Sequence, residues 1–285
     1  MTSTCRNALR IGDAGYPERL LEAPHPPRVL WAEGDVSLLD RRCVAVVGTR
    51  RATAYAERVA KELGRVLALA GATVVSGLAR GVDACAHRGA LEAGGATAAV
   101  LGTGLDVVYP RAHAALQRTI AQNGLLLSEL EPMDPAHGGS FPERNRIIAA
   151  LCVATIVVEG GVGSGALITA RHAMEMGRNV GVVPGPIDVP QAQGSNALLA
   201  EGAAVIASMA DSLTLAGLVA PLHVSSLPQA GAERRLWDAL ADGPADLDTL
   251  CTRAALPAHE GLAAVTALEV RGMIECAMSG EIRRM

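Results

Sequence analysis

The sequence predicts an α/β protein in which helices cover both faces of a mostly parallel sheet and a small winged helix follows. Between residues 43 and 215, short β-branched runs alternate with longer helical segments, which is the pattern of such a sheet. Half of the 285 residues are hydrophobic, enough to bury the cores of one large domain and one small one. The runs expected to form strands are residues 44–47, 73–76, 98–101, 125–128, 155–158, 179–183 and 204–206.

These runs are almost continuously apolar, as expected for strands that are buried on both faces. The segment after the first run has the period of a helix, with apolar residues along one side at Val59, Leu63, Val66, Leu67 and Ala70. Gly71 follows at the position where glycine commonly ends a helix. One apolar stripe is therefore expected to pack this helix onto the sheet.

Residues 1–40 precede the expected sheet domain, which covers residues 41–219. Pro24, Pro26 and Pro27 limit regular structure in this lead-in, because proline lacks the backbone N–H that helices and strands use. We expect the lead-in to form a strap over the sheet domain rather than a domain of its own.

The C-terminal part of the chain has a different composition. Residues 220–232 contain the prolines, serines and glycines that are typical of a linker. Residues 233–285 predict three helices followed by two short extended segments, which is the order of a winged helix-turn-helix. The helices are expected at residues 233–241, 247–254 and 260–271.

The charge balance excludes a generally basic nucleic-acid coat. The formal net charge is -4, so any DNA site must be a local concentration of positive charge. Nearly all of that charge is arginine, and Lys61 is the only lysine. Arginine suits planar, bidentate contacts to phosphate, although a GC-rich genome explains the arginine content equally well. Phe141 is the only phenylalanine, so base stacking would rest on very few rings.

Other features of the composition are those of an ordinary intracellular protein. Residues 1–10 lack the apolar core of a signal peptide, and no stretch approaches the roughly 18 apolar residues of a membrane helix. The chain is expected to be soluble and cytoplasmic. Its six cysteines show no CxxC spacing and are expected to be reduced, and its seven histidines form no ligand-spaced cluster, so we expect no metal.

Ligands of open parallel sheets bind beyond the carboxyl ends of the strands. Glycine-rich loops follow the first three expected strands, and they include Gly48, Thr49 and Arg50 after the first and Arg80 after the second. Such loops bring N–H groups close to an anion, to which arginine adds charge-assisted hydrogen bonds. Glycines after strands are also routine turn formers. Neither GxGxxG nor a P-loop follows the first strand, so we expect no nucleotide cofactor.

Two further segments belong to the same edge of the expected sheet. The first, before the fifth strand, places a ring, two guanidiniums and an amide within six residues: Phe141, Arg144, Asn145 and Arg146. An ordinary core position explains Phe141 equally well. The second, after that strand, resembles an anion-binding nest that opens a helix and offers two hydroxyl donors: Gly163, Ser164, Gly165 and Thr169.

Three stretches resemble the signatures of the DprA/Smf family of DNA-processing proteins. They are residues 76–83 (SGLARGVD), 141–149 (FPERNRIIA) and 164–170 (SGALITA), and shorter matches extend the resemblance over residues 16–207. The resemblance implies an extended Rossmann-like domain that binds single-stranded DNA in a basic pocket. It also implies a homodimer through that domain, where residues 196–200 offer an apolar face, and assistance in loading the RecA recombinase during natural transformation and recombination.

The sequence departs from the family pattern in two places. The family often has a lysine where Gly163 stands, so one cationic contact is missing or is supplied elsewhere. The sterile-alpha-like domain that precedes the sheet in some members is not expected, because only about forty residues are available. Neither departure changes the resemblance.

The favoured hypothesis is a sequence-tolerant binder without catalysis. In it the arginines hold phosphates, the backbone of residues 163–165 supplies N–H donors, and Phe141 or Asn145 meets a base. One alternative is an enzyme on nucleotide monophosphates, similar to phosphoribohydrolases, with Glu159 as its acid or base; no second carboxylate or nucleophile is evident. Another is a reader of duplex DNA, but residues 225–285 carry six arginines against nine acids.

Overall fold

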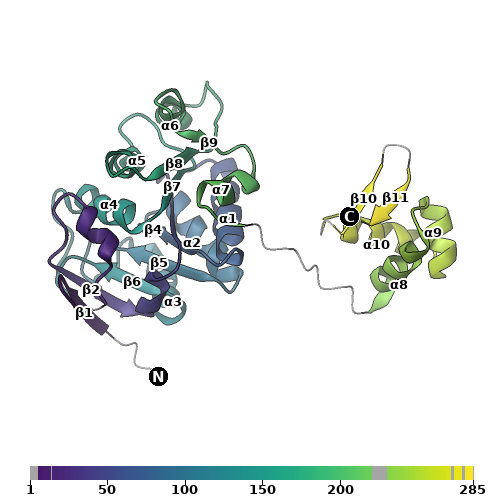
Figure 1. The fold of residues 1–285 in the computed structure, drawn as a ribbon, viewed down its shortest axis with the longest axis horizontal. Coiled ribbons are helices and arrows are strands. Elements are labelled where there is room, and N and C mark those ends of the chain that lie inside the picture. The colour runs from purple at the N-terminus through teal and green to yellow at the C-terminus, as the bar shows by residue number, and fades with distance from the viewer. Residues whose placement is uncertain (1–5, 14, 220–229, 271–272, 278–279, 285) are drawn as a thin grey trace. The chain divides into compact units, whose positions relative to one another are not determined.

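The computed structural model describes residues 6–13, 15–219, 230–270, 273–277 and 280–284. The chain divides into two compact units, Met1–Pro221 and Leu222–Met285 (Figure 1). The first is a sheet covered by helices, and the second is a winged helix. The predicted fold class is confirmed.

Within the described residues, the first unit contains a nine-stranded sheet in the order β1-β2-β6-β5-β4-β3-β7-β8-β9. Strands β3 to β9 pair in parallel. Every strand expected from the sequence is present within two residues of its predicted bounds. These strands are β3 (Cys43–Val47), β4 (Thr73–Ser76), β5 (Ala96–Val100), β6 (Leu125–Ser128), β7 (Ala154–Val157), β8 (Asn179–Val182) and β9 (Ala204–Val205).

The two faces of the sheet have separate cores, because alternate residues of a strand point to opposite faces. On β3, Cys43, Ala45 and Val47 belong to one core cluster, and Val44 and Val46 belong to the other. Helices α4 (Ser140–Leu151), α5 (Gly165–Glu175) and α6 (Pro190–Ala200) supply the first cluster. Helices α1 (Ala54–Leu69), α2 (Val82–Glu92) and α7 (Met209–Leu215) supply the second, and α3 (Ala114–Asn123) packs on β5 and β6.

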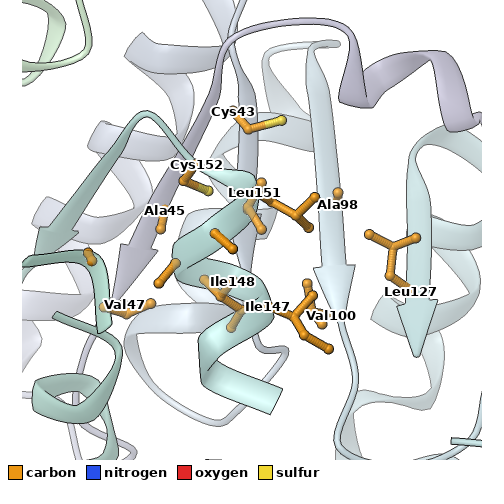
Figure 2. Close-up of a cluster of buried hydrophobic side chains, with 14 of the residues drawn as sticks. Cys43, Ala45, Val47, Ala98, Val100, Leu127, Ile147, Ile148, Leu151 and Cys152 are labelled. Carbon is orange, nitrogen blue, oxygen red and sulfur yellow. The ribbon is translucent and has the colours of Figure 1, made fainter. Parts of the chain in front are cut away.

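The first cluster holds α4 against the sheet. Figure 2 shows Ile147, Ile148 and Leu151 of this helix beside β3 and β5. All three side chains are almost completely buried. Since burial of each large apolar side chain contributes about 1.5–3 kcal/mol, the position of α4 on the sheet is firmly set.

Helices α1 and α2 cross closely because each has glycine at the crossing. A side chain at Gly64 would collide with the carbonyl of Ala86, and one at Gly89 would collide with the carbonyl of Lys61. Lys61 also forms an ion pair with Glu92 of the neighbouring helix, with Nζ 2.8 Å from the carboxylate oxygen. This crossing fixes the N-termini of both helices at the carboxyl edge of the sheet.

The lead-in has more regular structure than the prolines suggested. It contributes β1 (Arg6–Arg10) and β2 (Val29–Gly34), and β2 pairs antiparallel with both β1 and β6. The prolines lie before β2, in which alternate residues Leu30 and Ala32 are buried in the first core cluster. The two-residue period in residues 29–34 therefore indicates a strand, and this signal was more informative than the number of prolines.

The second unit has its own hydrophobic core. Its elements are α8 (Gly231–Ala239), η4 (Leu240–Asp242), α9 (Leu247–Ala254), α10 (Ala258–Val270), β10 (Ile274–Cys276) and β11 (Ile282–Arg284). Leu236, Leu250, Leu268 and Ile282 are among the residues that form this core. Of the linker predicted at residues 220–232, residues 220–229 lie outside the described residues, and α8 begins within its last part. No helix in the described ranges is long and apolar enough to span a bilayer.

A buried histidine lies between α2 and the sheet. The His87 Nδ1 atom is 2.7 Å from the Thr97 hydroxyl oxygen, and that hydroxyl donates to the carbonyl of Val74 at 2.8 Å. Because the hydroxyl proton is used, Nδ1 must be the donor. Nε2 is then a bare acceptor, which is buried and has no hydrogen-bond partner among the described residues. Burial lowers the pKa of His87 from 6.5 to about 3.

This histidine should make the sheet unit less stable in mild acid. As pH falls below 6.5, His87 binds a proton in the unfolded chain but stays neutral in the folded protein. The free energy of unfolding should therefore fall by about 2 kcal/mol by pH 5. The measurement is urea unfolding at pH 7 and pH 5, followed by Trp31 fluorescence in a Trp237→Phe background. His87→Leu should reduce this pH dependence by that amount, and exposed His137→Gln should not. Equal pH dependence in His87→Leu would show that other groups cause it.

Candidate nucleic-acid interface

A cleft of about 970 Å³ opens at the carboxyl ends of β3 and β7. These neighbouring strands are the point at which the chain order of the parallel sheet reverses, because β4 and β5 follow on one side of β3 and β7 and β8 on the other. Ligands of open α/β sheets bind at such switch points. Ten of the twelve predicted site residues line the cleft: Gly48, Thr49, Arg50, Phe141, Arg144, Asn145, Gly163, Ser164, Gly165 and Thr169.

The N-terminus of α5 forms one wall of the cleft. Ser164 is its N-cap, and the Ser164 hydroxyl accepts a hydrogen bond from the Ala166 N–H at 3.4 Å. Gly163, just before it, has a φ of +79°, which glycine adopts without strain. Gly163 and Gly165 are both exposed, so backbone approaches the open cleft without side chains in between. The positive end of the helix dipole therefore faces the place where an anion would sit.

Arg144 forms the floor of the cleft and is almost completely buried. Its guanidinium donates to the carbonyls of Gly77, at 2.9 Å, and Val100, at the ends of β4 and β5. Burial lowers its pKa to about 10, against the opposing attraction of the Asp83 carboxylate. Asp83 in turn accepts hydrogen bonds from the N–H groups of Gly77 and Ala79. Arg144 is thus used inside the protein, where it holds α4 and two loops in register.

Asn145 and Thr169 connect α4 to the start of α5. The Asn145 side-chain amide donates to the Gly165 carbonyl at 3.0 Å, and its oxygen accepts from Arg144 Nε at 3.2 Å. The Thr169 hydroxyl lies 3.4 Å from the same Gly165 carbonyl. These groups position the anion-facing turn, and their hydrogen bonds are already made within the protein.

Arg50 and Phe141 form the exposed part of the site. The guanidinium carbon of Arg50 lies 5.2 Å from the centroid of the Phe141 ring, within the range of a cation–π contact. Phe141 is half-buried at the cleft wall and lies over Gly102, where a side chain would collide with the ring. The ring is not part of a core cluster in the described structure. A cation and an aromatic face are therefore presented together to the cleft.

Arg80 and Arg146 are not brought together with the other predicted residues. The Arg146 guanidinium donates to the carbonyls of Pro24 and His25 and forms an ion pair with Glu129 at 2.8 Å, so it ties the lead-in to α4. Arg80 is exposed in the loop after β4, outside the cleft lining.

The spacing of residues along α4 distinguishes Arg144, which lines the cleft, from Arg146, which does not. Phe141, Arg144, Asn145 and Ile148 lie at i, i+3, i+4 and i+7 on the face that lines the cleft, whereas Arg146 is two residues from Arg144 and faces away. Four polar lining residues were not among the predicted site residues: Arg51, Asp83, and Gln191 and Gln193 at the start of α6. Arg51 was marked by its place after β3, but the glutamines follow β8 at a distance that only the fold reveals.

Glu159, the acid of the alternative enzyme hypothesis, is buried at the end of β7. Its carboxylate accepts from the N–H of Thr53 at 2.9 Å and from the Thr53 hydroxyl at 3.0 Å. Thr53 is the N-cap of α1, so these bonds attach α1 to the sheet. Glu159 does not line the cleft.

Comparison with known proteins gives a consistent result. Residues 7–217 match the family model of DNA recombination-mediator protein A, and residues 220–279 match that of the DprA winged helix domain. The protein Smf of Escherichia coli is 36% identical over 284 residues, which cover 94% of this chain and 75% of the relative.

Two solved structures are also similar. DNA processing protein A from Streptococcus pneumoniae has a TM-score of 0.70 and 40% identity, over 75% of this chain and 74% of that chain. DNA processing protein A from Helicobacter pylori, whose structure was described for its single-stranded-DNA binding mode, has a TM-score of 0.67 and 34% identity, over 74% and 95%.

The buried position of Arg144 predicts a loss of stability on substitution. Arg144→Ala should lower the free energy of unfolding by about 3 kcal/mol or more, because it removes the donor to the buried Val100 carbonyl and to the partly buried Gly77 carbonyl and leaves Asp83 without its positive neighbour. Urea unfolding measures this change. Exposed Arg50→Ala should stay within about 0.5 kcal/mol of the unsubstituted protein. Similar stabilities for the two variants would contradict a structural role for Arg144.

Proposed function

Because the chain belongs to the DprA/Smf family of DNA recombination-mediator proteins, we propose that it binds single-stranded DNA in the cleft between β3 and β7. The single observation that carries this proposal is the pairing of Arg50 with Phe141 in the same cleft as the N-terminus of α5. A phosphate is attracted by the guanidinium and by the helix N-terminus, and the ring offers a face for a base. The H. pylori relative described for single-stranded-DNA binding supports the same ligand class.

Binding of this kind tolerates sequence variation. Every base has a face that stacks on a ring, and phosphate contacts carry no sequence information. Single strands are favoured over duplex because their bases are free to leave the stack and meet Phe141. Arg51, which is exposed and lines the cleft, supplies the positive charge that the family lysine provides where this chain has Gly163.

We propose a binder rather than an enzyme of the phosphoribohydrolase type. The enzyme alternative would need Glu159 as its acid or base. Both carboxylate oxygens of Glu159 already accept hydrogen bonds from Thr53. The polar side chains that line the cleft are guanidiniums, amides, hydroxyls and one carboxylate, that of Asp83. Asp83 is buried beside Arg144 and already accepts hydrogen bonds from the N–H groups of Gly77 and Ala79, so its task is to hold the loop after β4.

Assistance in RecA loading during natural transformation and recombination, and a homodimer through the sheet unit, belong to the same proposal and are supported by family membership. On α6, Leu198 is buried in the core of its own unit, while Ala197 and Ala200 are exposed. A dimer contact in this region would therefore use the small residues of the helix and its neighbours.

Substitution of Arg50 tests the proposed site. Arg50→Ala should weaken binding of labelled single-stranded oligonucleotides of any sequence and reduce the slope of log K against log salt by about 0.7, the value for one lost phosphate contact. Fluorescence anisotropy at several salt concentrations measures both. Arg58→Ala is the matched control, because Arg58 is an exposed arginine 5.6 Å from the Tyr55 ring and does not line the cleft. An unchanged slope in Arg50→Ala would place the DNA elsewhere.

The winged helix should contribute little to single-strand affinity. Residues 225–285 have three more acids than arginines, and several of the arginines are paired: Arg234 with Asp238, Arg235 with Glu260 and Arg283 with Glu275. Few cations are therefore left to attract a polyanion.

Deletion of residues 231–285 should accordingly leave single-strand affinity within about two-fold, as measured by the same anisotropy assay. The circular dichroism of the truncated protein controls for folding of the sheet unit. A loss of about ten-fold or more, equivalent to about 1.4 kcal/mol, would identify the winged helix as a second DNA site.

A further inference from the structure

An aromatic residue outside the cleft continues the surface that Arg50 and Phe141 begin. The Tyr109 ring, in the loop that leads from β5 to η3 (Arg111–His113), lies 5.1 Å from the Phe141 ring between centroids. Tyr109 is 49% exposed. Phe141 therefore contacts Arg50, which lines the cleft, and Tyr109, which does not. Through Phe141, Arg50 in the loop after β3 is therefore connected to Tyr109 in the loop after β5.

Two exposed arginines belong to the same part of the edge. Arg111 follows Tyr109 by two residues, and Arg80 is in the loop after β4, the strand between β3 and β5. The two loops are fastened together, because Nδ1 of buried His113 lies 3.0 Å from the carbonyl oxygen of Leu78. Within the described part of the chain, neither Arg80 nor Arg111 forms an ion pair.

We infer that Tyr109, Arg80 and Arg111 form a second subsite for the single strand that the cleft binds. The strand runs along the carboxyl edge of the sheet from the α5 N-terminus, past Arg50 and Phe141, and places a further base on the exposed face of Tyr109. Arg80 and Arg111 contact the phosphates on either side of that base. This inference rests on the proposed function and extends it to a longer strand and a direction along the sheet.

The chemistry of the cluster matches this ligand. A tyrosine ring stacks on any base, and guanidiniums bind phosphate with paired donors. A role in packing against Phe141 accounts for the position of the Tyr109 ring, but it does not account for two exposed guanidiniums on the tied loops beside it. The subsite also gives a role to Arg80, a predicted site residue that does not line the cleft.

The chain offers a matched control for Tyr109. Tyr55 is 42% exposed and has Arg58 5.6 Å from its ring, so it presents similar chemistry. It is on the first turn of α1 and does not line the cleft, and in the described part of the chain no ring contact joins it to Phe141. A difference between variants at Tyr109 and Tyr55 therefore reports position rather than the loss of an exposed ring.

The test is binding of fluorescein-labelled oligothymidylates of about 4 to about 16 nucleotides, the range of site sizes of single-strand-binding folds, to the full-length chain. Tyr109→Ala should lose about ten-fold in affinity for the longest oligonucleotide, and less than about two-fold for the shortest that the unsubstituted protein binds. Tyr109→Phe and Tyr55→Ala should bind like the unsubstituted protein at every length. Arg80→Ala and Arg111→Ala should each reduce the salt slope by about 0.7, for long oligonucleotides only.

A fluorescent reporter gives an independent readout of stacking. In Tyr109→Trp, the introduced indole should be quenched by long oligonucleotides and not by the shortest, while Tyr55→Trp should be quenched by neither. Tyr109→Ala that binds normally at all lengths would overturn the inference, as would an equal loss at all lengths, which would mean that Tyr109 only supports Phe141. Failure of the unsubstituted protein to bind any oligonucleotide would instead overturn the proposed function itself, and the subsite with it.

Discussion

The buried guanidinium of Arg144 joins the helix that forms the site to the sheet that carries it. It donates to carbonyls at the ends of β4 and β5, so α4 is attached to two strands that are not its neighbours in sequence. Desolvation of a charge is costly, and the hydrogen bonds to Gly77 and Val100 and the nearby Asp83 offset part of that cost. Gly77 must be glycine, because a side chain there would occupy the space of the guanidinium. The geometry of the cleft depends on this contact.

The polar residues of the site therefore have two different tasks. Arg144, Asn145 and Thr169 satisfy one another and the backbone, and they hold the turn at Gly165 in place before a ligand arrives. Arg50 and Phe141 face the open cleft, where the proposed ligand would meet them. Such preorganisation favours affinity, since less ordering of side chains remains to be done on binding.

The sequence was sufficient for the parallel strands because each is an apolar run that must be buried on both faces, and little else in the chain has that property. The site loops followed from the strands, since the carboxyl ends of parallel strands share an edge. Strands β1 and β2 of the lead-in were not predicted, because the prolines before β2 were given more weight than the alternation within it. Side-chain direction was the other limit: Arg144 and Arg146 are two residues apart in one motif, and the helix turns them to opposite sides. Their separate partners, Val100 and His25, are far away in the chain and appear only in the fold.

The single lysine of the chain has a consequence for regulation. Lys61 is paired with Glu92 at the crossing of α1 and α2, and the cations that line the cleft are arginines. Acetylation removes the charge of lysine and has no such effect on a guanidinium. Among the described residues that line the cleft there is thus no amine that acylation could neutralise, so lysine acylation would leave the positive charge of the proposed site unchanged.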